Sequence, residues 1–141
     1  VDIPWTHGLT GYSDADVLIH AVCDALLGAA GLGDIGRHFP NTDSSNENRD
    51  SREFLQTVRL LLEKAGYRAH NIDCTVLAEA PKLAPYLEAM QANMASDLLI
   101  APGSVHVKAT TTEQLGSIGR GEGIAVFAVV LIDETQKDSK T

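Results

Sequence analysis

The sequence has few cysteines, few basic residues and no long hydrophobic run. Its two cysteines, Cys23 and Cys74, form no CxxC pair and have no companion cysteines, which argues against a cysteine-ligated metal site. We expect both to be reduced core residues. No apolar run approaches the roughly 18 residues needed to span a bilayer, and no secretory signal is visible. We therefore expect no membrane partner, and either a cytoplasmic protein or the mature part of an organellar one.

The chain also has few basic residues. The chain has 11 lysines and arginines against 19 aspartates and glutamates, for a formal net charge of -8. A nucleic-acid backbone is held by clustered lysine and arginine, so nonspecific nucleic-acid binding is excluded. Any phosphate bound by this chain must be held locally, by amides, a metal and a few basic residues.

The composition is that of one globular domain. With 141 residues, 44% of them hydrophobic and 21% charged, the chain can bury a core without disulfides. It begins at Val1 and goes directly into what looks like the end of a strand. We expect one domain over residues 1–141 that lacks an N-terminal strand segment.

Hydrophobic periodicity predicts an α+β fold. Helices are expected from Ser13 to about residue 30, over 51–65 and over 83–98, with glycines and a proline marking their ends. Strands are expected at 72–78, 105–109 and 123–132, with a first edge strand at 1–4. The nearly continuous apolar run at 123–132 predicts a central strand that is covered on both faces. This order predicts a mixed four-stranded sheet with helices packed on one face and ferredoxin-like split βαβ connections.

The densest group of polar side chains follows the strand predicted at 105–109. Residues 109–116 read ATTTEQLG, and residues 119–123 read GRGEG. Glycines let the backbone approach a ligand, threonine hydroxyls donate to phosphoryl oxygens, and arginine supplies a bidentate positive group. Glu113 is suited to a hard cation such as Mg²⁺, which prefers oxygen ligands shared with phosphates. An ordinary polar turn after a strand would have a similar composition.

The first predicted helix carries a polar stripe on an otherwise apolar surface. Ser13, Asp16, His20 and Asp24 fall within one quarter of its circumference. A buried polar stripe needs partners, so His20 is the natural metal ligand, with Asp16 or Asp24 orienting its other ring nitrogen. A histidine satisfied by the core is the alternative. Zinc needs three or four protein ligands, which this helix does not supply alone.

Together these segments closely resemble the 2-C-methyl-D-erythritol 2,4-cyclodiphosphate synthase family. The resemblance lies in SDADVLIHAVCDALLGAAGLGDIGRHFPNTD at 13–43, DSR at 50–52, AEAPK at 78–82 and VKATTTEQLGSIGRGEG at 107–123, and it runs without obvious gaps from about residue 3 to 131. It implies closure of 4-diphosphocytidyl-2-C-methyl-D-erythritol 2-phosphate into a cyclic diphosphate with loss of CMP, in the non-mevalonate isoprenoid pathway. The family implies a bacterial cytoplasmic or plastid stromal location.

The resemblance also implies the partners and the site. It implies a homotrimer with active sites between subunits, each with one Zn²⁺ and one Mg²⁺ or Mn²⁺, and an axial cavity lined near Arg120 and Glu122 that can take an isoprenoid diphosphate. The metal ligands would be His20 for zinc and Glu113 for the second cation, and Thr111 and Tyr12 would be the catalytic residues. The residues that would contact the substrate are Tyr12, Ser13, Asp34, Ile35, Gly36, Phe39, Pro40, Asn41, Thr42, Asp43, Ala78, Glu79, Ala80, Pro81, Lys82, Leu83, Ala84, Thr110, Thr111, Thr112, Glu113, Ser117 and Arg120.

The sequence departs from the family pattern in three places. The Asp-x-His pair that completes the family's zinc site does not occur here, and we expect it in a segment that precedes Val1. Tyr12 stands where the family usually has histidine, and tyrosine donates a hydrogen bond without carrying positive charge near neutral pH. Ser117 and Ile118 replace the usual aromatic-Thr or aromatic-Leu pair before the Gly-Arg.

Two rival functions follow from these departures. The chain could be a non-catalytic trimeric protein that binds a nucleotide or an isoprenoid diphosphate. It could also be a metal phosphohydrolase, in which water replaces the 2-phosphate as nucleophile and the product is linear.

Overall fold

The computed structural model describes residues 11–39, 51–78, 84–111, 113–119 and 124–135, and at 11–16, 84 and 117 it describes the backbone alone. The long elements are α1 (Gly11–Ala29), α3 (Ser51–Ala65), β1 (Tyr67–Leu77), α4 (Leu87–Leu98), β2 (Val105–Thr110) and β3 (Ala125–Glu134). Short turns of helix join them: α2 (Ile35–His38), η2 (Ala84–Tyr86), η3 (Pro102–Ser104) and α5 (Gly116–Gly119). The predicted α+β architecture is confirmed.

The described strands form a mixed sheet in the order β2-β1-β3. β1 runs parallel to β2, from Ile72 opposite Val105 to Leu77 opposite Thr110, and antiparallel to β3. α4 makes the crossover between β1 and β2, which are direct neighbours, so this βαβ unit is not split. The strand expected at 1–4, and any split connection that it would make, lie outside the described residues.

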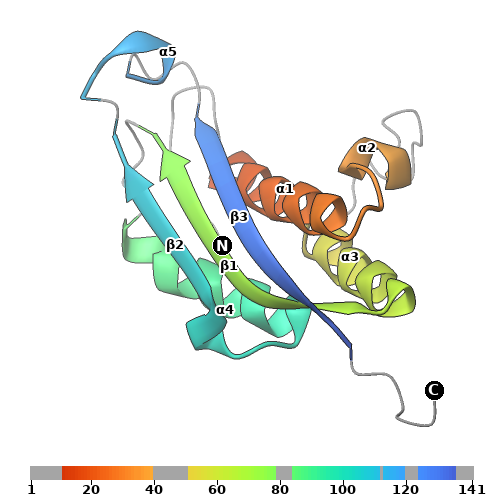
Figure 1. Ribbon diagram of the computed structural model, residues 1–141. Coiled ribbons are helices and arrows are strands. Elements are labelled where there is room, and N and C mark those ends of the chain that lie inside the picture. The colour runs from red at the N-terminus through yellow and green to blue at the C-terminus, as the bar shows by residue number, and fades with distance from the viewer. Residues whose placement is uncertain (1–10, 40–50, 79–83, 112, 120–123, 136–141) are drawn as a thin grey trace, which may run out of the picture.

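The long helices cover one face of this sheet (Figure 1). α1 packs against β3 and α3, and α4 packs against β2 and α3. Between the layers lies a single apolar core whose fully buried members include Val22, Leu26, Leu27, Leu55, Val58, Leu62, Ile72, Met94 and Val105. Each such side chain contributes roughly 1.5–3 kcal/mol relative to full exposure. The prediction of helices on one face is confirmed.

The helix boundaries follow the local sequence signals closely. α3 spans the predicted 51–65 and is followed by Gly66 at φ 90°, a conformation that favours glycine. α1 begins at Gly11, two residues before the predicted start, and Gly31 follows its end at φ 72°. α4 begins at Leu87 rather than 83, after a 3₁₀ turn that contains Pro85, which cannot donate a backbone hydrogen bond.

The prediction that the last strand is covered on both faces is wrong for the isolated chain. Its predicted central position depends on the strand expected at 1–4, which lies outside the described residues. β1 occupies the middle of the described sheet. On β3, Phe127 is 61% exposed, Val129 is 70% exposed and Leu131 is 57% exposed. Their neighbours Val126, Ala128 and Val130 point toward the helices and pack against the core. The apolar run therefore supplies two surfaces, and only one of them is covered by this chain's own helices.

No helix in the part of the chain that the structure describes is long and apolar enough to cross a membrane. Both cysteines are buried and unpaired, as predicted. Cys23 lies on α1 and Cys74 on β1, and burial raises the pKa of each thiol to about 12. Neither thiol is placed to act as a nucleophile or a metal ligand near neutral pH.

Candidate functional site

Two segments predicted to bind the same ligand begin side by side at one end of the sheet. β1 and β2 are parallel, so their carboxyl ends lie side by side, and each is followed by one of the predicted segments. The amide of Ala78 donates to the carbonyl of Thr110 at 3.0 Å. The chain therefore leaves β1 into 78–84 directly beside the start of the 110–113 turn. Open α/β sheets bind their ligands at the carboxyl ends of their strands, which is where these two segments begin.

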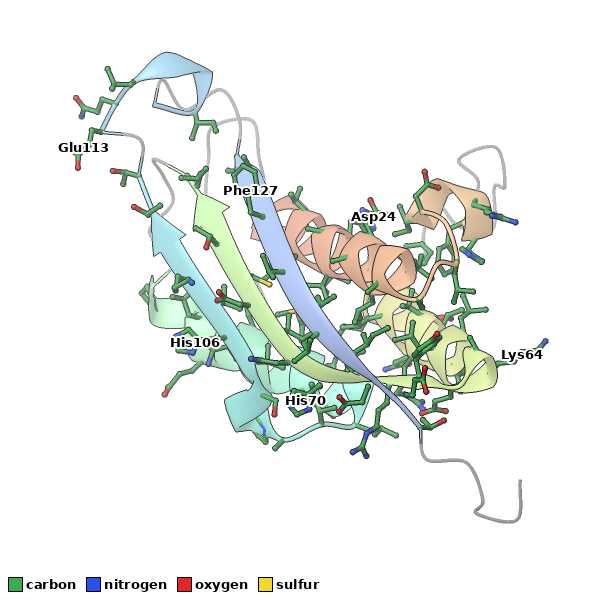
Figure 2. The ribbon with its side chains drawn as sticks, in the orientation of Figure 1. Asp24, Lys64, His70, His106, Glu113 and Phe127 are labelled. Carbon is green, nitrogen blue, oxygen red and sulfur yellow. The ribbon has the colours of Figure 1, made fainter. Side chains whose placement is uncertain are left out.

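The turn after β2 holds Glu113 and Gln114 in an unusual backbone conformation. Glu113 has φ 57° and Gln114 has φ 65°, which lie in the left-handed region that costs non-glycine residues free energy. The Glu113 amide donates to Thr111 Oγ1 at 3.2 Å. Both side chains are exposed, and Figure 2 shows Glu113 at the tip of the molecule, next to α5. Such strain is typical of backbone that presents polar groups to a ligand.

His20 lies on α1 with its ring exposed at one edge. The ring packs edge-on against Phe54, with centroids 5.6 Å apart, and Phe54 in turn packs against Phe39 at 4.5 Å. The aromatic contacts fix the plane of the imidazole while leaving His20 accessible. A metal-ligating histidine needs this combination of access and fixed orientation.

A third segment, 33–39, begins one turn beyond the end of α1. The Asp34 side chain caps α2 by accepting from the Arg37 amide at 3.0 Å. Asp24 of α1 accepts from the Ile35 amide at 2.6 Å through Oδ1. Figure 2 shows Asp24 on the side of α1 that faces α2. Asp16 or Asp24 was expected to orient His20. One oxygen of Asp24 accepts from the Ile35 amide instead, and the Asp16 side chain lies outside what the structure describes.

Phe39 and His38 anchor the far end of that segment. Phe39 is only 8% exposed, so its ring is part of the core, and a ligand contact from this residue must come from its backbone. His38 donates from Nε2 to the Leu32 carbonyl at 2.7 Å. The turn at Asp34, Ile35 and Gly36 is thus fixed on both sides.

The remaining predicted site residues are not all described. Tyr12 and Ser13 lie in the first turn of α1, Ala84 in η2 and Ser117 in α5, in each case by backbone alone. Predictions for Pro40, Asn41, Thr42, Asp43, Glu79, Ala80, Pro81, Lys82, Leu83, Thr112 and Arg120 fall outside the described residues, as does Glu122.

Among the described residues, each of the two implied metals has one suitable ligand, His20 for Zn²⁺ and Glu113 for Mg²⁺. No group of three or more histidine, cysteine, aspartate or glutamate side chains capable of holding a metal occurs within residues 11–39, 51–78, 84–111, 113–119 and 124–135. His20 offers an imidazole, which suits Zn²⁺, and Glu113 offers a carboxylate, which suits Mg²⁺. Both are exposed at positions from which further ligands can be added. The chemistry of the donors fits the implied ions, and completion of either site needs residues beyond this set.

Sequence reasoning missed two polar links near this site. One is the bond between Asp24 and the Ile35 amide. The other is a buried cluster in which Asp97 of α4 accepts from Arg52 and Gln56 of α3. Both join residues 11 to 45 positions apart, so no spacing rule within one helix indicates them. The DSR motif was noted at 50–52, but its partner on α4 was not.

Comparison with known proteins identifies the family. The model of the YgbB family matches residues 1–133. The chain belongs to the YgbB family. Among its curated relatives, the 2-C-methyl-D-erythritol 2,4-cyclodiphosphate synthase of Nitrosospira multiformis is 58% identical over 132 residues, which cover 94% of this chain and 75% of that protein. The synthase of Geobacillus kaustophilus is 57% identical over 135 residues, covering 96% and 85%.

Solved structures of YgbB-type proteins share the fold. The 2-C-methyl-D-erythritol 2,4-cyclodiphosphate synthase of Plasmodium vivax superposes with a TM-score of 0.71 at 36% identity, over 85% of this chain and 70% of that one. The IspF of Plasmodium falciparum, solved as a complex with CDP, superposes with a TM-score of 0.75 at 32% identity, over 94% and 76%. The family resemblance read from the motifs is confirmed.

Proposed function

We propose that this chain converts 4-diphosphocytidyl-2-C-methyl-D-erythritol 2-phosphate into 2-C-methyl-D-erythritol 2,4-cyclodiphosphate and releases CMP, the reaction of a phosphorus-oxygen lyase in isoprenoid biosynthesis. The carrying observation is the 58% identity to a synthase of this activity over 94% of the chain. The junction of the 78–84 and 110–113 segments at one strand edge supports it, because a diphosphate needs donors from both sides.

The reaction needs positioning more than it needs a base. An oxygen of the 2-phosphate is already negatively charged, and it forms a bond to the β-phosphorus. The bond from that phosphorus to the oxygen shared with CMP breaks, and CMP leaves with that oxygen. The protein must fold the substrate so that the attacking and leaving oxygens lie in line.

Thr111 would assist at the reacting phosphoryl group. Its oxygen accepts from the Glu113 amide, so its own proton points elsewhere and is available to a phosphoryl oxygen. The Tyr12 hydroxyl, at the start of α1, would add one donor where relatives use histidine. Both donors offset charge that grows on the phosphoryl oxygens.

Two cations complete the charge balance. Zn²⁺ on His20 and Mg²⁺ or Mn²⁺ on Glu113 would supply positive charge to the diphosphate, which a chain of net charge -8 cannot supply alone. His20 would be one of the three or four protein ligands that zinc needs. The 34–36 turn, with residues 39–43, would hold the methylerythritol part.

The cytidine would lie on the other side of the diphosphate. The P. falciparum relative binds CDP. In this chain we assign the same nucleotide to residues 78–84, with Lys82 as the positive group. Backbone amides in that segment would donate to the base and its phosphates.

The working form is proposed to be a homotrimer with active sites between subunits. Its support is the open face of the sheet, where Phe127, Val129 and Leu131 form an exposed apolar stripe. Asp73 and Lys108 form an ion pair of 2.9 Å on neighbouring strands, and both are about half exposed. A stripe of this kind needs a partner surface, and a copy of the same sheet would bury it. Arg120 and Glu122 would line the axis, where an isoprenoid diphosphate could bind.

The curated sequence relatives from N. multiformis and G. kaustophilus are bacterial, which favours the bacterial cytoplasm over the plastid stroma as the site of action. Phosphorus NMR of the protein with the substrate, Zn²⁺ and Mg²⁺ tests the activity. A cyclic diphosphate together with CMP supports the synthase. A linear methylerythritol phosphate would indicate a hydrolase, and an unchanged spectrum with bound CDP would indicate a binding protein.

A further inference from the structure

The structure assigns Asp24 as a positioning residue that holds the 34–36 turn against α1 through a hydrogen bond to the Ile35 amide. This inference rests on the proposed function for its kinetic consequences, because that function gives the turn the methylerythritol part of the substrate. The bond itself is independent of any substrate. Its Oδ1 to nitrogen distance is 2.6 Å, which is short for an amide donating to a carboxylate.

The Ile35 amide needs a hydrogen-bond acceptor from outside α2. Ile35 is the first residue of α2, and the first amides of a helix have no partner within it. Asp34 satisfies the Arg37 amide through its own side chain. Asp24, from a different element, satisfies the Ile35 amide. Two carboxylates therefore define where α2 begins and how it lies against α1.

The surrounding backbone leaves little freedom for an alternative. Gly33 has φ 94°, and a Cβ at that position would lie 2.8 Å from the Arg37 side chain. The Phe39 amide returns to the Ile35 carbonyl at 2.8 Å, and the Phe39 ring is buried. With both ends fixed, the position of the Asp34 and Gly36 backbone depends on what holds Ile35 between them.

Asp24 also connects this turn to the proposed zinc ligand. It lies four residues after His20, on the same face of α1. The helix that orients His20 thus orients the turn through one carboxylate. Without the hydrogen bond from Asp24 to the Ile35 amide, the proposed methylerythritol pocket could shift relative to the zinc. Such a shift would slow the reaction, because the attacking and leaving oxygens must lie in line at the phosphorus.

We assign Asp24 the role of a hydrogen-bond acceptor for the Ile35 amide. This role can be distinguished from an effect of the Asp24 charge on His20. Asp24→Asn keeps an acceptor oxygen and removes the charge, whereas Asp24→Ala removes both. We expect Asp24→Ala to raise the KM for the full substrate and to lower kcat, each by about tenfold, from the loss of one hydrogen bond to a charged group. We expect Asp24→Asn to stay within about threefold of wild type in both constants.

Two readouts do not require turnover. Amide hydrogen exchange in the peptide that covers residues 33–39 should accelerate by about tenfold in Asp24→Ala and should stay near wild type in Asp24→Asn. The affinity for CDP should be unchanged in both, because the nucleotide is assigned to the 78–84 and 110–113 segments. Glu134→Ala, an exposed carboxylate at the opposite end of the sheet, is the matched control and should alter none of these measurements.

The possible results distinguish a failure of the positioning role from a failure of the proposed function. Unchanged exchange at 33–39 in Asp24→Ala overturns the assignment, since the bond would then not hold the turn. If Asp24→Asn is as impaired in kinetics as Asp24→Ala, Asp24 acts through its charge, and the positioning role is wrong. If the wild-type chain with both metals forms no cyclic product, the proposed function fails, while the exchange comparison still decides whether Asp24 holds the turn.

Discussion

Arg52 and Asp97 form a bidentate ion pair between α3 and α4. Arg52 Nε donates to Oδ2 and its terminal nitrogen to Oδ1, both at 2.9 Å. Asp97 is 4% exposed, and Gln56 adds a third bond to Oδ1 at 3.0 Å. Because Ser51 begins α3 and is itself buried, this cluster fixes the point at which the chain re-enters the core after residues 40–50. That segment carries part of the proposed methylerythritol site.

Asp97→Ala should lower the free energy of unfolding by about 1.5–3 kcal/mol, because it removes the acceptor shared by Arg52 and Gln56, while the Arg52 side chain, 39% exposed, can regain water. Urea unfolding followed by circular dichroism measures this change. Glu53→Ala removes an exposed carboxylate from the first turn of α3 and is expected to change stability by about 0.5 kcal/mol or less. A loss below 1 kcal/mol in Asp97→Ala would show that the cluster does not hold the two helices together.

Thr111→Ala should reduce kcat by about a hundredfold or more, because it removes a donor aimed at the reacting phosphoryl group. Steady-state release of CMP measures the effect, and light scattering should show the same assembly as wild type. Thr111→Ser keeps the hydroxyl and should recover most of the activity. Unchanged turnover in Thr111→Ala would remove this side chain from the mechanism.

Phe127→Glu should dissociate the proposed trimer, because it places a charge in the exposed stripe on β3, at its largest side chain. Light scattering coupled to size-exclusion chromatography should show the mass of a trimer for wild type and of a monomer for the variant. Leu60→Glu alters another exposed apolar residue, 55% accessible on α3, and should leave the assembly intact. A wild-type monomer would contradict both the interface and the sharing of active sites between subunits.

His20→Ala should abolish zinc binding, because it removes the imidazole that we propose α1 contributes to the zinc site. Atomic emission analysis of the purified protein gives the zinc content. His70→Ala removes an exposed histidine that bonds to Asp133 at 2.8 Å, far from the strand edge, and should keep the zinc of wild type. Full zinc content in His20→Ala would disprove the ligand assignment.

The local parts of this structure were readable from sequence, and the long-range parts were not. The bounds of α3 followed from its apolar stripe and Gly66, and the meeting of 78–84 with 110–113 was implied by family motifs. The exposed stripe on β3 was mistaken for a covered strand. An apolar run has the same composition whether its second face is covered by the chain itself or is left open for a partner.

The polar links that position the site were harder to predict for another physical reason. Asp24 and Ile35 come together only because the glycines after α1 turn the chain back along the helix. Arg52 and Asp97 meet only because α3 and α4 pack side by side. Such pairs depend on tertiary distance, which periodicity within one element does not encode.

The buried thiols predict a loss of stability at alkaline pH. Desolvation, with a smaller effect of Asp24, raises the Cys23 pKa from 9.0 to about 12. Above pH 9 the unfolded chain releases this proton while the folded chain keeps it, so the folded state binds more protons and its stability falls as pH rises toward 12. Cys23→Ala removes this effect, and its slope of unfolding free energy against pH should be shallower by about 0.7 kcal/mol per pH unit at pH 9 and by about 1.3 at pH 10.5. At pH 7 the variant should be less stable than wild type because of the cavity it leaves, and the gap should narrow with rising pH in urea titrations. A gap that stays constant from pH 7 to 10.5 would mean that the Cys23 thiol does not titrate differently in the two states.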